Sequence, residues 1–355
     1  MNSNKLPTMS GPVCPIPLSH GEKIVLGHGS GGKMTNDLIK NTFLPPLDNP
    51  ALRAGDDAGV VQANPCTRLA ISTDAHVVSP LFFPGGDIGK LAVCGTVNDV
   101  AMMGATPLFL TAGFILEEGL DISVLERVTY SMKMAAAEAG VEIVAGDTKV
   151  VQKNKADGLY ITTAGVGTLI PGVEIGGAQA RPGDTIIVSG TLGDHGIAVL
   201  GARGELGFEA EIDSDVAPLN HLIAAILDAS DGVHVLRDPT RGGVASTLNE
   251  IAVQSGVGMI INETAIPVAL AVQAACEMLG FDPLYVANEG KLIAIVAPQD
   301  AAQVLKAMRR TQYGSEAVII GQVTTHPPGR VLMKTAFGST RVVDVLAGEM
   351  LPRIC

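Results

Sequence analysis

The sequence predicts two domains of the α/β or α+β class. Its 355 residues are enough for about two domains of roughly 150 residues each. Strand-like and helix-like patterns alternate along the chain, but not as regular βαβ units. Residues 171–183 are rich in Pro and Gly, and we place the domain boundary within them. The expected domains are 21–175 and 176–340, with a flexible N-terminal tail at 1–20 and a mobile C-terminal tail at 341–355.

The expected elements of the first domain follow from two kinds of hydrophobic pattern. Short runs rich in Val, Ile and Thr predict strands, and apolar residues at a spacing of three or four predict helices. Strands are expected at 23–26, 69–73, 107–116, 142–145 and 158–170. Helices are expected at 34–42, 87–103 and 122–139, the last of them ending before Gly140, a residue type typical of helix C termini.

The second domain shows the same alternation. Strands are expected at 185–189, 259–262, 292–296 and 318–323, followed by two short β-like segments. Helices are expected just after residue 196 and at 218–229, 244–254, 268–279 and 301–310. Neither half contains a convincing internal repeat.

Composition excludes several classes of protein. With 47% hydrophobic and 17% charged residues, the chain is not disordered throughout. A net charge of −12 repels a phosphate backbone, and Trp is absent, so nucleic acid is not an expected partner. No apolar run reaches the roughly 20 residues of a membrane helix, and residues 1–20 lack the apolar core of a signal peptide. Five cysteines without a CxxC motif suggest neither disulfides nor zinc, and we expect a cytoplasmic protein.

A glycine-rich segment, 27–35, superficially matches two nucleotide-binding templates. It lacks the Ser or Thr that follows the Lys of a P-loop, because Met34 stands there. A Rossmann unit needs an acidic residue about 20 positions further on, and Pro45 and Pro46 interrupt that region. We reject both templates. A glycine loop whose backbone N–H groups touch a phosphate remains as probable as a merely flexible loop.

Acidic residues recur near the expected strand ends: Asp56, Asp57, Asp74, Asp147 and Asp194. Asn98 and Asp99 join them from an expected helix. Gly-Asp is a common turn dipeptide, and any single instance is best explained that way. Several instances in one half of the chain indicate converging oxygen ligands. Hard oxygen ligands without a histidine partner suit Mg²⁺ rather than zinc.

The chain ends on a thiol, in the order Leu351, Pro352, Arg353, Ile354, Cys355. Pro352 favours an extended rather than a helical tail, and Arg353 places a cation beside the thiol. A terminal side chain can enter a pocket that an internal residue could not. A flexible terminus without function is an equally simple interpretation, and these residues alone favour it.

A set of longer motifs resembles a known family. They are Gly55-Asp56-Asp57-Ala58, Ser72-Thr73-Asp74-Ala75-His76, Phe83-Pro84-Gly85-Gly86-Asp87-Ile88-Gly89, Thr96-Val97-Asn98-Asp99-Val100-Ala101, Gly146-Asp147-Thr148-Lys149, Arg237-Asp238-Pro239-Thr240-Arg241-Gly242-Gly243 and Asn288-Glu289-Gly290. They resemble the PurM-like ATP-binding superfamily, which includes aminoimidazole ribonucleotide synthetase and thiamine-monophosphate kinase. The ending Pro352-Arg353-Ile354-Cys355 is similar to one branch, the HypE carbamoyl dehydratases.

The resemblance implies a two-domain PurM-like fold. The sheet of the N-terminal domain would form a β-barrel across a homodimer, and the C-terminal domain would be an α/β domain with a mixed sheet. ATP and Mg²⁺ would bind by the N-terminal domain. The terminal thiol would receive a carbamoyl group from the carbamoyltransferase HypF. ATP-dependent dehydration would convert this group to a cyano group, which would then pass to iron on the HypC–HypD complex.

The resemblance also implies site residues. The catalytic residues would be Cys355, Glu289 and Lys149. The ATP-binding residues would be Asp56, Asp57, Asp74, Asp87, Asn98, Asp99, Asp147 and Arg241. Magnesium ligands would be drawn from Asp57, Asp74, Asp99 and Asp147, and which of them bind directly stays open. For a lone charge, the default for Lys149 is a solvated surface cation and for Glu289 a carboxylate in a loop.

Two alternative functions stay open at this stage. A related kinase or synthetase acting on a free small molecule would not need Cys355. A non-catalytic nucleotide-binding scaffold would release no ADP, even with a carbamoylated tail.

Overall fold

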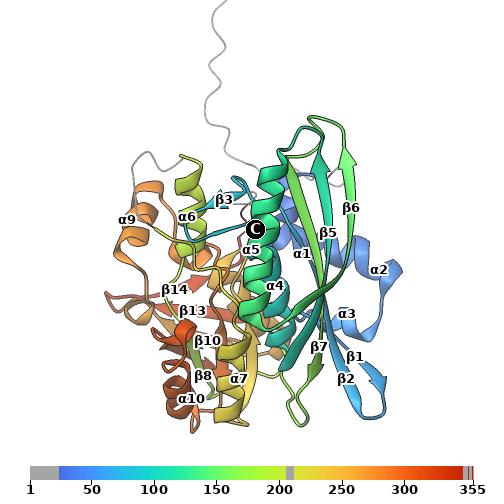
Figure 1. Cartoon of the computed structure of the whole chain (residues 1–355). Helices are drawn as coiled ribbons and strands as arrows, with labels where there is room; N and C mark the ends of the chain where they lie inside the picture. Colours follow the sequence, from blue (N-terminus) through green and yellow to red (C-terminus); the bar gives the residue numbers. More distant parts are fainter. Residues whose placement is uncertain (1–23, 205–211, 347–350, 352–353, 355) are drawn as a thin grey trace, which may run out of the picture.

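The computed structural model describes residues 24–204, 212–346, Leu351 and Ile354, and contains two large β-sheets with helices packed on them (Figure 1). One sheet is built from residues 59–169 and the other from residues 185–343. Within the described ranges, no helix is long and apolar enough to cross a membrane. Cys355, the whole N-terminal tail (1–20) and part of the C-terminal tail lie outside the described residues.

The first sheet has five strands in the order β1-β2-β7-β5-β6, and only the β5–β6 pair is parallel. The strands are β1 (Gly59–Asn64), β2 (Thr67–His76), β5 (Ala105–Glu117), β6 (Glu142–Val151) and β7 (Leu159–Leu169). A small hairpin pairs β3 (Phe82–Phe83) with β4 (Gly86–Asp87). Short helical segments precede the sheet: η1 (Leu26–Gly29), α1 (Lys33–Leu38), η2 (Ile39–Phe43), α2 (Leu44–Leu47) and α3 (Pro50–Ala54).

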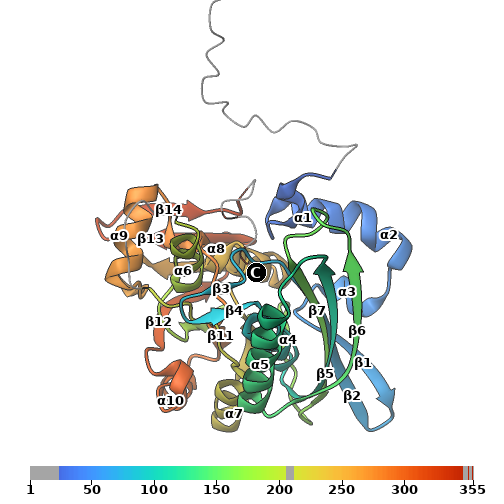
Figure 2. The same ribbon diagram turned by 45° about the horizontal axis from the view of Figure 1, so that its top comes forward.

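Two helices cover one face of this sheet, α4 (Ile88–Met102) and α5 (Ile122–Ala139), and they lie side by side in both views (Figures 1 and 2). Helix α4 is buried apart from Lys90 and Asp99, as expected for a helix without a continuous polar stripe. Its N terminus is capped by Asp87, whose Oδ1 accepts hydrogen bonds from the N–H groups of Gly89 and Lys90. As expected, α5 ends at Gly140, which adopts a left-handed conformation with φ 73°.

The second sheet has seven strands in the order β14-β13-β10-β12-β8-β11-β9, and only β10 and β13 pair in parallel. The strands are β8 (Thr185–Val188), β9 (Val233–Arg237), β10 (Gly258–Asn262), β11 (Ile293–Val296), β12 (Val318–Thr324), β13 (Arg330–Lys334) and β14 (Thr340–Val343). The helices are α6 (Asp194–Ala202), α7 (Asn220–Ala229), α8 (Gly243–Ser255), α9 (Leu270–Leu279) and α10 (Ala301–Met308), with η3 (Glu263–Ala265), η4 (Pro283–Tyr285) and η5 (Gln312–Gly314).

Alternate side chains of the second sheet pack into two separate hydrophobic cores. Ile186 and Val188 pack with α8 on one face. Ile187 packs with α7 and α10 on the other, as the period of two in a strand requires. Met102, at the end of α4, belongs to this second core, so the buried helix of the first sheet also packs against the second.

The structure corrects three expectations about local structure. Residues 23–26 do not form the predicted strand in the described part, because η1 begins at Leu26. Strand β2 continues to His76, and β6 continues to Val151. Asp74, Asp147 and Lys149 therefore lie within strands rather than at or beyond strand ends. Pairing with the long β5 and β7 extends both strands past the Gly and Asp that normally mark turns.

Candidate active site

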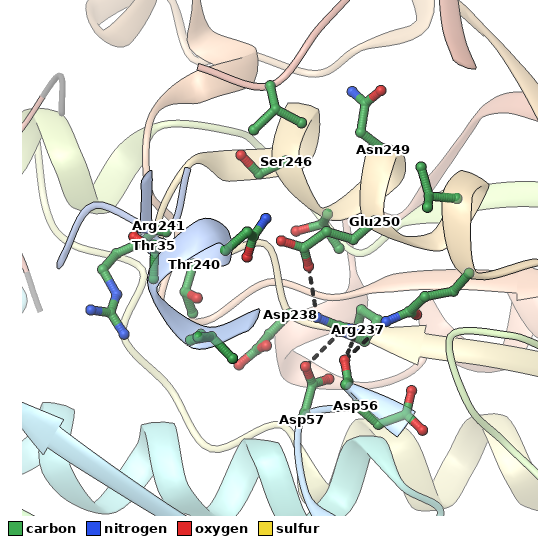
Figure 3. Close-up of a pocket in the computed structure, with 18 of the residues that line it drawn as sticks. Thr35, Asp56, Asp57, Arg237, Asp238, Thr240, Arg241, Ser246, Asn249 and Glu250 are labelled. Atoms are coloured by element: carbon green, nitrogen blue, oxygen red, sulfur yellow. Dashed lines mark hydrogen bonds and ion pairs between the residues drawn. The ribbon is translucent and has the colours of Figure 1, made fainter. Parts of the chain in front are cut away.

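A pocket of about 870 Å³ lies between the two sheets. Its walls come from α1, the loop between α3 and β1, strand β2, helix α4, the segment after β9, and helix α8 (Figure 3). Six of the expected site residues line it: Asp56, Asp57, Asp74, Asp99, Arg241 and Glu289. Side chains that are up to 233 positions apart in sequence thus share one cavity.

Carboxylates dominate the pocket, and burial makes their charged forms costly. Burial raises the pKa of Asp57 and of Asp99, and neighbouring carboxylates add to both shifts. The Ser72 hydroxyl donates to Asp99 Oδ2 at 2.6 Å and partly opposes the shift. Burial also raises the pKa of Asp238 to about 6, although the Arg237 guanidinium works against it. Such a concentration of buried negative charge is typical of a site completed by cations.

Arg237 is the main cation that holds these acids together. Its Nε lies 2.5 Å from Asp57 Oδ1, and its Nη2 donates to Glu250 Oε2 at 3.1 Å (Figure 3). Its Nη1 also donates to the carbonyl oxygen of Gly55 at 3.4 Å. One buried side chain therefore ties the loop before β1 to helix α8, and so fixes the two domains across the pocket.

Several buried polar atoms at the pocket have no hydrogen-bond partner within the described part of the chain. They are Asp57 Oδ2, Ser246 Oγ, Gln254 Oε1, Glu289 Oε1 and Arg237 Nε, the last of which still forms its ion pair with Asp57. Buried polar groups in folded proteins are nearly always paired, so unpaired ones indicate groups that await a ligand. Two of the five are carboxylate oxygens, which are ligands for hard cations.

The donor set fits Mg²⁺ bound together with phosphates. The acids of the pocket offer only oxygen atoms, as this ion prefers. Among the described residues, however, no three Asp, Glu, His or Cys side chains form a ready metal cage. Mg²⁺ commonly binds through one or two carboxylates plus substrate phosphates. The carboxylates of the pocket are suited to this mode of binding, which needs no complete protein cage.

Glu289 stands in the loop between η4 and β11 and faces the pocket although it is almost fully buried. Burial raises its pKa well above the ordinary value, and the charges of Asp238, Asp74 and Asp215 add to the effect. Its backbone is held from two sides. The Glu289 N–H donates to Asp215 Oδ1 at 3.0 Å, and Asn98 Nδ2 donates to the Glu289 carbonyl oxygen at 3.4 Å.

The remaining expected residues lie outside the pocket lining. Asp87 caps α4, as described above. Asn98 is fully buried, and among the described residues its side chain bonds to backbone groups of Ala217, Leu219 and Glu289. Asp147 and Lys149 stand on the exposed edge strand β6, where their side chains pair at 2.7 Å. Cys355 is outside the described residues.

Sequence reasoning missed several residues that shape the pocket. Arg237 and Asp238 belong to a motif that the sequence analysis quoted, yet only Arg241 of that motif was selected. Glu250 and Ser246 had no sequence signal, because they face the pocket only through the orientation of α8. The Arg-Asp pair before Pro239 is the signal that could have been used, since adjacent opposite charges before a turn are suited to an ion-pair network.

Comparison with known proteins agrees with this geometry. Residues 55–169 match the model for the N-terminal domain of AIR synthase related proteins, and residues 181–334 match the model for their C-terminal domain. The protein is 56% identical over 341 residues to the carbamoyl dehydratase HypE of Cupriavidus necator, covering 96% of this chain and 97% of that one.

Two solved structures are also similar. A HypE in complex with ATP has a TM-score of 0.79 at 48% identity, covering 94% of this chain and 100% of that one. A HypE–HypF complex has a TM-score of 0.83 at 49% identity, covering 87% of this chain and 99% of that one. The order of the two family matches and an identity near one half over nearly the whole length agree, so this chain belongs to the HypE family of carbamoyl dehydratases, among the AIR synthase related proteins.

Proposed function

We propose that this protein uses ATP to dehydrate a carbamoyl group carried on the thiol of Cys355, and so supplies cyanide ligands for the iron of [NiFe]-hydrogenase. One observation carries the proposal beyond family membership. Ile354, the residue bonded to Cys355, packs in the same buried cluster as Ala287, two residues before Glu289. The end of the chain and the candidate base therefore share one region of the molecule.

The chemistry explains the need for ATP. The oxygen of Cys–S–CO–NH₂ is a poor leaving group. Attack of this oxygen on the γ-phosphorus releases ADP and one nitrogen proton, and gives Cys–S–C(OPO₃)=NH. Breaking the C–O bond then releases phosphate and the second nitrogen proton, and leaves Cys–S–C≡N. The elements of one water are lost in total, with the oxygen leaving on phosphate.

Glu289 is our candidate for the base that takes the nitrogen proton. Its unpaired Oε1 faces the pocket, and its raised pKa makes its carboxylate a stronger proton acceptor near neutral pH. Asn98 and Asp215 hold its backbone, so both serve as positioning residues. Asp215 also contributes to the raised pKa through its charge.

The acidic cluster is our candidate for the triphosphate site. Asp57, Asp74 and Asp99 would hold Mg²⁺ on the phosphates, with Asp56 and Arg241 beside them. The bound ion would neutralise charge that develops during phosphoryl transfer. The solved HypE in complex with ATP supports a nucleotide site in this family. The unpaired Asp57 Oδ2 supports its position here.

The first sheet is our candidate for a dimer interface that forms a β-barrel, with residues 21–175 as the nucleotide-binding and dimerisation domain. The face opposite α4 and α5 keeps Ile71, Phe109 and Ile115 between 40% and 45% exposed. Ile71 and Phe109 both neighbour Val166 across the strands, so they form one patch. An apolar sheet face of this kind is typical of a protein interface.

The same face carries Asp147 and Lys149, which pair in register with Gly113 and Ile115 of β5. Neither residue lines the pocket of its own chain. We infer that they act in the pocket of the second protomer. There Lys149 would contribute a compact positive charge to the transferring phosphoryl group, and Asp147 would contribute to the metal site.

The partners follow from the same chemistry. HypF would load the carbamoyl group, as the solved complex between a HypE and HypF suggests. The HypC–HypD complex would accept the cyano group on iron. A cytoplasmic location agrees with the free thiols of Cys66, Cys94 and Cys276.

Replacing Cys355 tests the proposal directly. Cys355→Ala should abolish formation of thiocyanate while leaving ATP affinity unchanged, because the tail thiol does not support the nucleotide site. Adding several residues after Cys355 should be nearly as damaging, because the thiol must enter the site as a chain end. Cys66→Ala, at an exposed thiol elsewhere, is the matched control and should stay fully active. Full activity of Cys355→Ala would contradict the proposal.

A further inference from the structure

Ile354, the residue before Cys355, packs against the rest of the protein. Ile354 is only 3% exposed, and it forms an antiparallel bridge with Val78, in the segment that follows β2. Arg203, the residue after α6, holds that segment in place, because its Nε donates a hydrogen bond to the carbonyl oxygen of Ser79 at 2.6 Å. A buried hydrophobic residue next to the last one needs a built site to receive it.

Five residues form that site, which we call the socket: Val78, Phe83, Gly196, Val199 and Ala287. Ile354 belongs to the same buried cluster as the four of these that have side chains. Gly196 lies between Val286 and the tail, because a Cβ there would clash with Val286 Cγ1 at 2.4 Å, crowd Leu351 Cδ1 at 3.2 Å and touch Ile354 Cδ1 at 3.4 Å. Two walls of the socket lead to pocket residues. Val78 lies four positions after Asp74, and Ala287 lies two before Glu289.

One buried histidine binds the backbone of the docked end. His195 Nε2 lies 2.7 Å from the carbonyl oxygen of Ile354, and Nδ1 lies 2.8 Å from Ser214 Oγ. A carbonyl oxygen can only accept, so Nε2 carries the proton and Nδ1 accepts from the Ser214 hydroxyl. Burial lowers the pKa of His195 to about 4, so the ring is neutral near pH 7. Phe83 contacts the ring edge-to-face, with centroids 5.4 Å apart.

We propose that His195 is a positioning residue for the carrier thiol: its hydrogen bond to the Ile354 carbonyl, together with the socket, docks the end of the chain for the dehydration step. The inference rests on the proposed role of Cys355. Consecutive Cα atoms are about 3.8 Å apart, so a docked Ile354 restricts the reach of the thiol that follows it. Ser214 supports this role by setting the tautomer of His195. A bond to backbone adds a restraint along the chain that the Ile354 side chain alone would not supply.

The first test measures docking without any carbamoyl donor or ATP. The rate at which iodoacetamide alkylates Cys355 is followed by mass spectrometry of the C-terminal peptide. His195→Leu, which keeps the bulk and removes the donor, should raise this rate about ten-fold, the effect of losing one buried hydrogen bond. His195→Gln retains an N–H donor and should raise it much less.

A matched control separates this bond from a general effect of losing a histidine. His221 on α7 also has its Nε2 near a backbone carbonyl oxygen, that of Glu138 at 3.0 Å, but it is exposed and outside the socket. His221→Leu should leave the alkylation rate of Cys355 unchanged. If His195→Leu fails to fold, Ile354→Ala gives the second test, because it empties the socket at the chain end.

The second test measures the consequence for catalysis. In a single turnover with a carbamoylated thiol, His195→Leu and Ile354→Ala should slow formation of the cyano adduct about ten-fold without changing ATP affinity. Equal alkylation rates in wild type, His195→Leu and Ile354→Ala would overturn the proposal. Equal effects of His195→Leu and His195→Gln would overturn the role of the donor. Faster alkylation in the variants, with no cyano adduct even in wild type, would contradict the proposed function while leaving the docking intact.

Discussion

Glu289 is a buried carboxylate with one oxygen unpaired in the described structure, and burial is the largest cause of its raised pKa. Burial of this kind destabilises the charged form of a carboxylate, so the group binds a proton more tightly. Its neighbours Asp238, Asp74 and Asp215 are also acids, so any cation that binds among them lowers the same pKa again. Nucleotide and metal binding would therefore tune this base.

The raised pKa of Glu289 predicts a pH dependence with a definite sign. The charged base becomes more populated as pH rises through the raised pKa, so dehydration of a preloaded thiol should speed up above the ordinary value of 4.5. Rapid-quench mass spectrometry measures this rate. Glu289→Gln should leave the thiol carbamoylated with little cyano product, whereas Glu277→Gln, at an exposed site on α9, should behave as wild type. A normal rate in Glu289→Gln would assign the base to another group.

Asp238 predicts a pH dependence of stability. Its pKa is raised to about 6 in the folded protein, against 3.8 ordinarily, so the folded state binds its proton more tightly. The resulting stabilisation is present below pH 3.8 and is lost as pH rises through about 6. Asp238→Asn should therefore become increasingly more stable than wild type as pH rises from 3.8 to about 6, by at most about 3 kcal/mol in the free energy of unfolding. Chemical denaturation at a series of pH values measures the difference, and a difference independent of pH would contradict the assignment.

At the scale of elements, helix α4 links several parts of the site. Asp87 caps it, Asn98 bonds across to the backbone of Ala217 and Glu289, and Asp99 faces the pocket. The sequence predicts α4 and α5 within one residue at each end, because their spacing and their caps are local signals. It does not predict that Asp87 and Asn98 act through the backbone, since this depends on segments far along the chain.

Strand β6 shows where local patterns fail. Gly146 and Asp147 suggest a turn, but pairing with β5 carries the strand on to Val151. That long-range pairing places Asp147 and Lys149 on the exposed face of an edge strand, away from the pocket. A resemblance in motif predicts that these residues are functional. The motif does not indicate in which pocket they would act.

Asp74 on β2 and Asp99 on α4 predict a metal-dependent effect on nucleotide binding. If they hold Mg²⁺ against the phosphates, Asp74→Asn and Asp99→Asn should weaken ATP binding strongly with Mg²⁺ and only slightly with EDTA. Calorimetry under both conditions measures the difference. Asp121→Asn is the control, because Asp121 precedes α5 at the surface and its side chain makes no capping bond. Equal weakening with and without metal would indicate a structural role instead.

At the scale of the whole molecule, the proposed dimer predicts complementation between two inactive variants. Lys149→Ala should slow ADP release in a single turnover, and Glu289→Gln should block formation of the cyano adduct. If Lys149 serves the pocket of the second protomer, mixed dimers contain one fully native pocket. An equal mixture should then recover about a quarter of wild-type activity after subunit exchange. No recovery in verified mixed dimers would place Lys149 in the pocket of its own chain, and would contradict the shared site.

The central claim is that Cys355 carries the carbamoyl group that is dehydrated in an ATP-dependent reaction. The mass of the C-terminal peptide tests this most directly. After incubation with HypF and a carbamoyl donor, the peptide that contains Cys355 should gain a carbamoyl group. Adding ATP and Mg²⁺ should then remove the mass of one water, as the carbamoyl adduct becomes a cyano adduct. A peptide that stays unmodified, or an adduct that loses water equally well without ATP, would contradict the account.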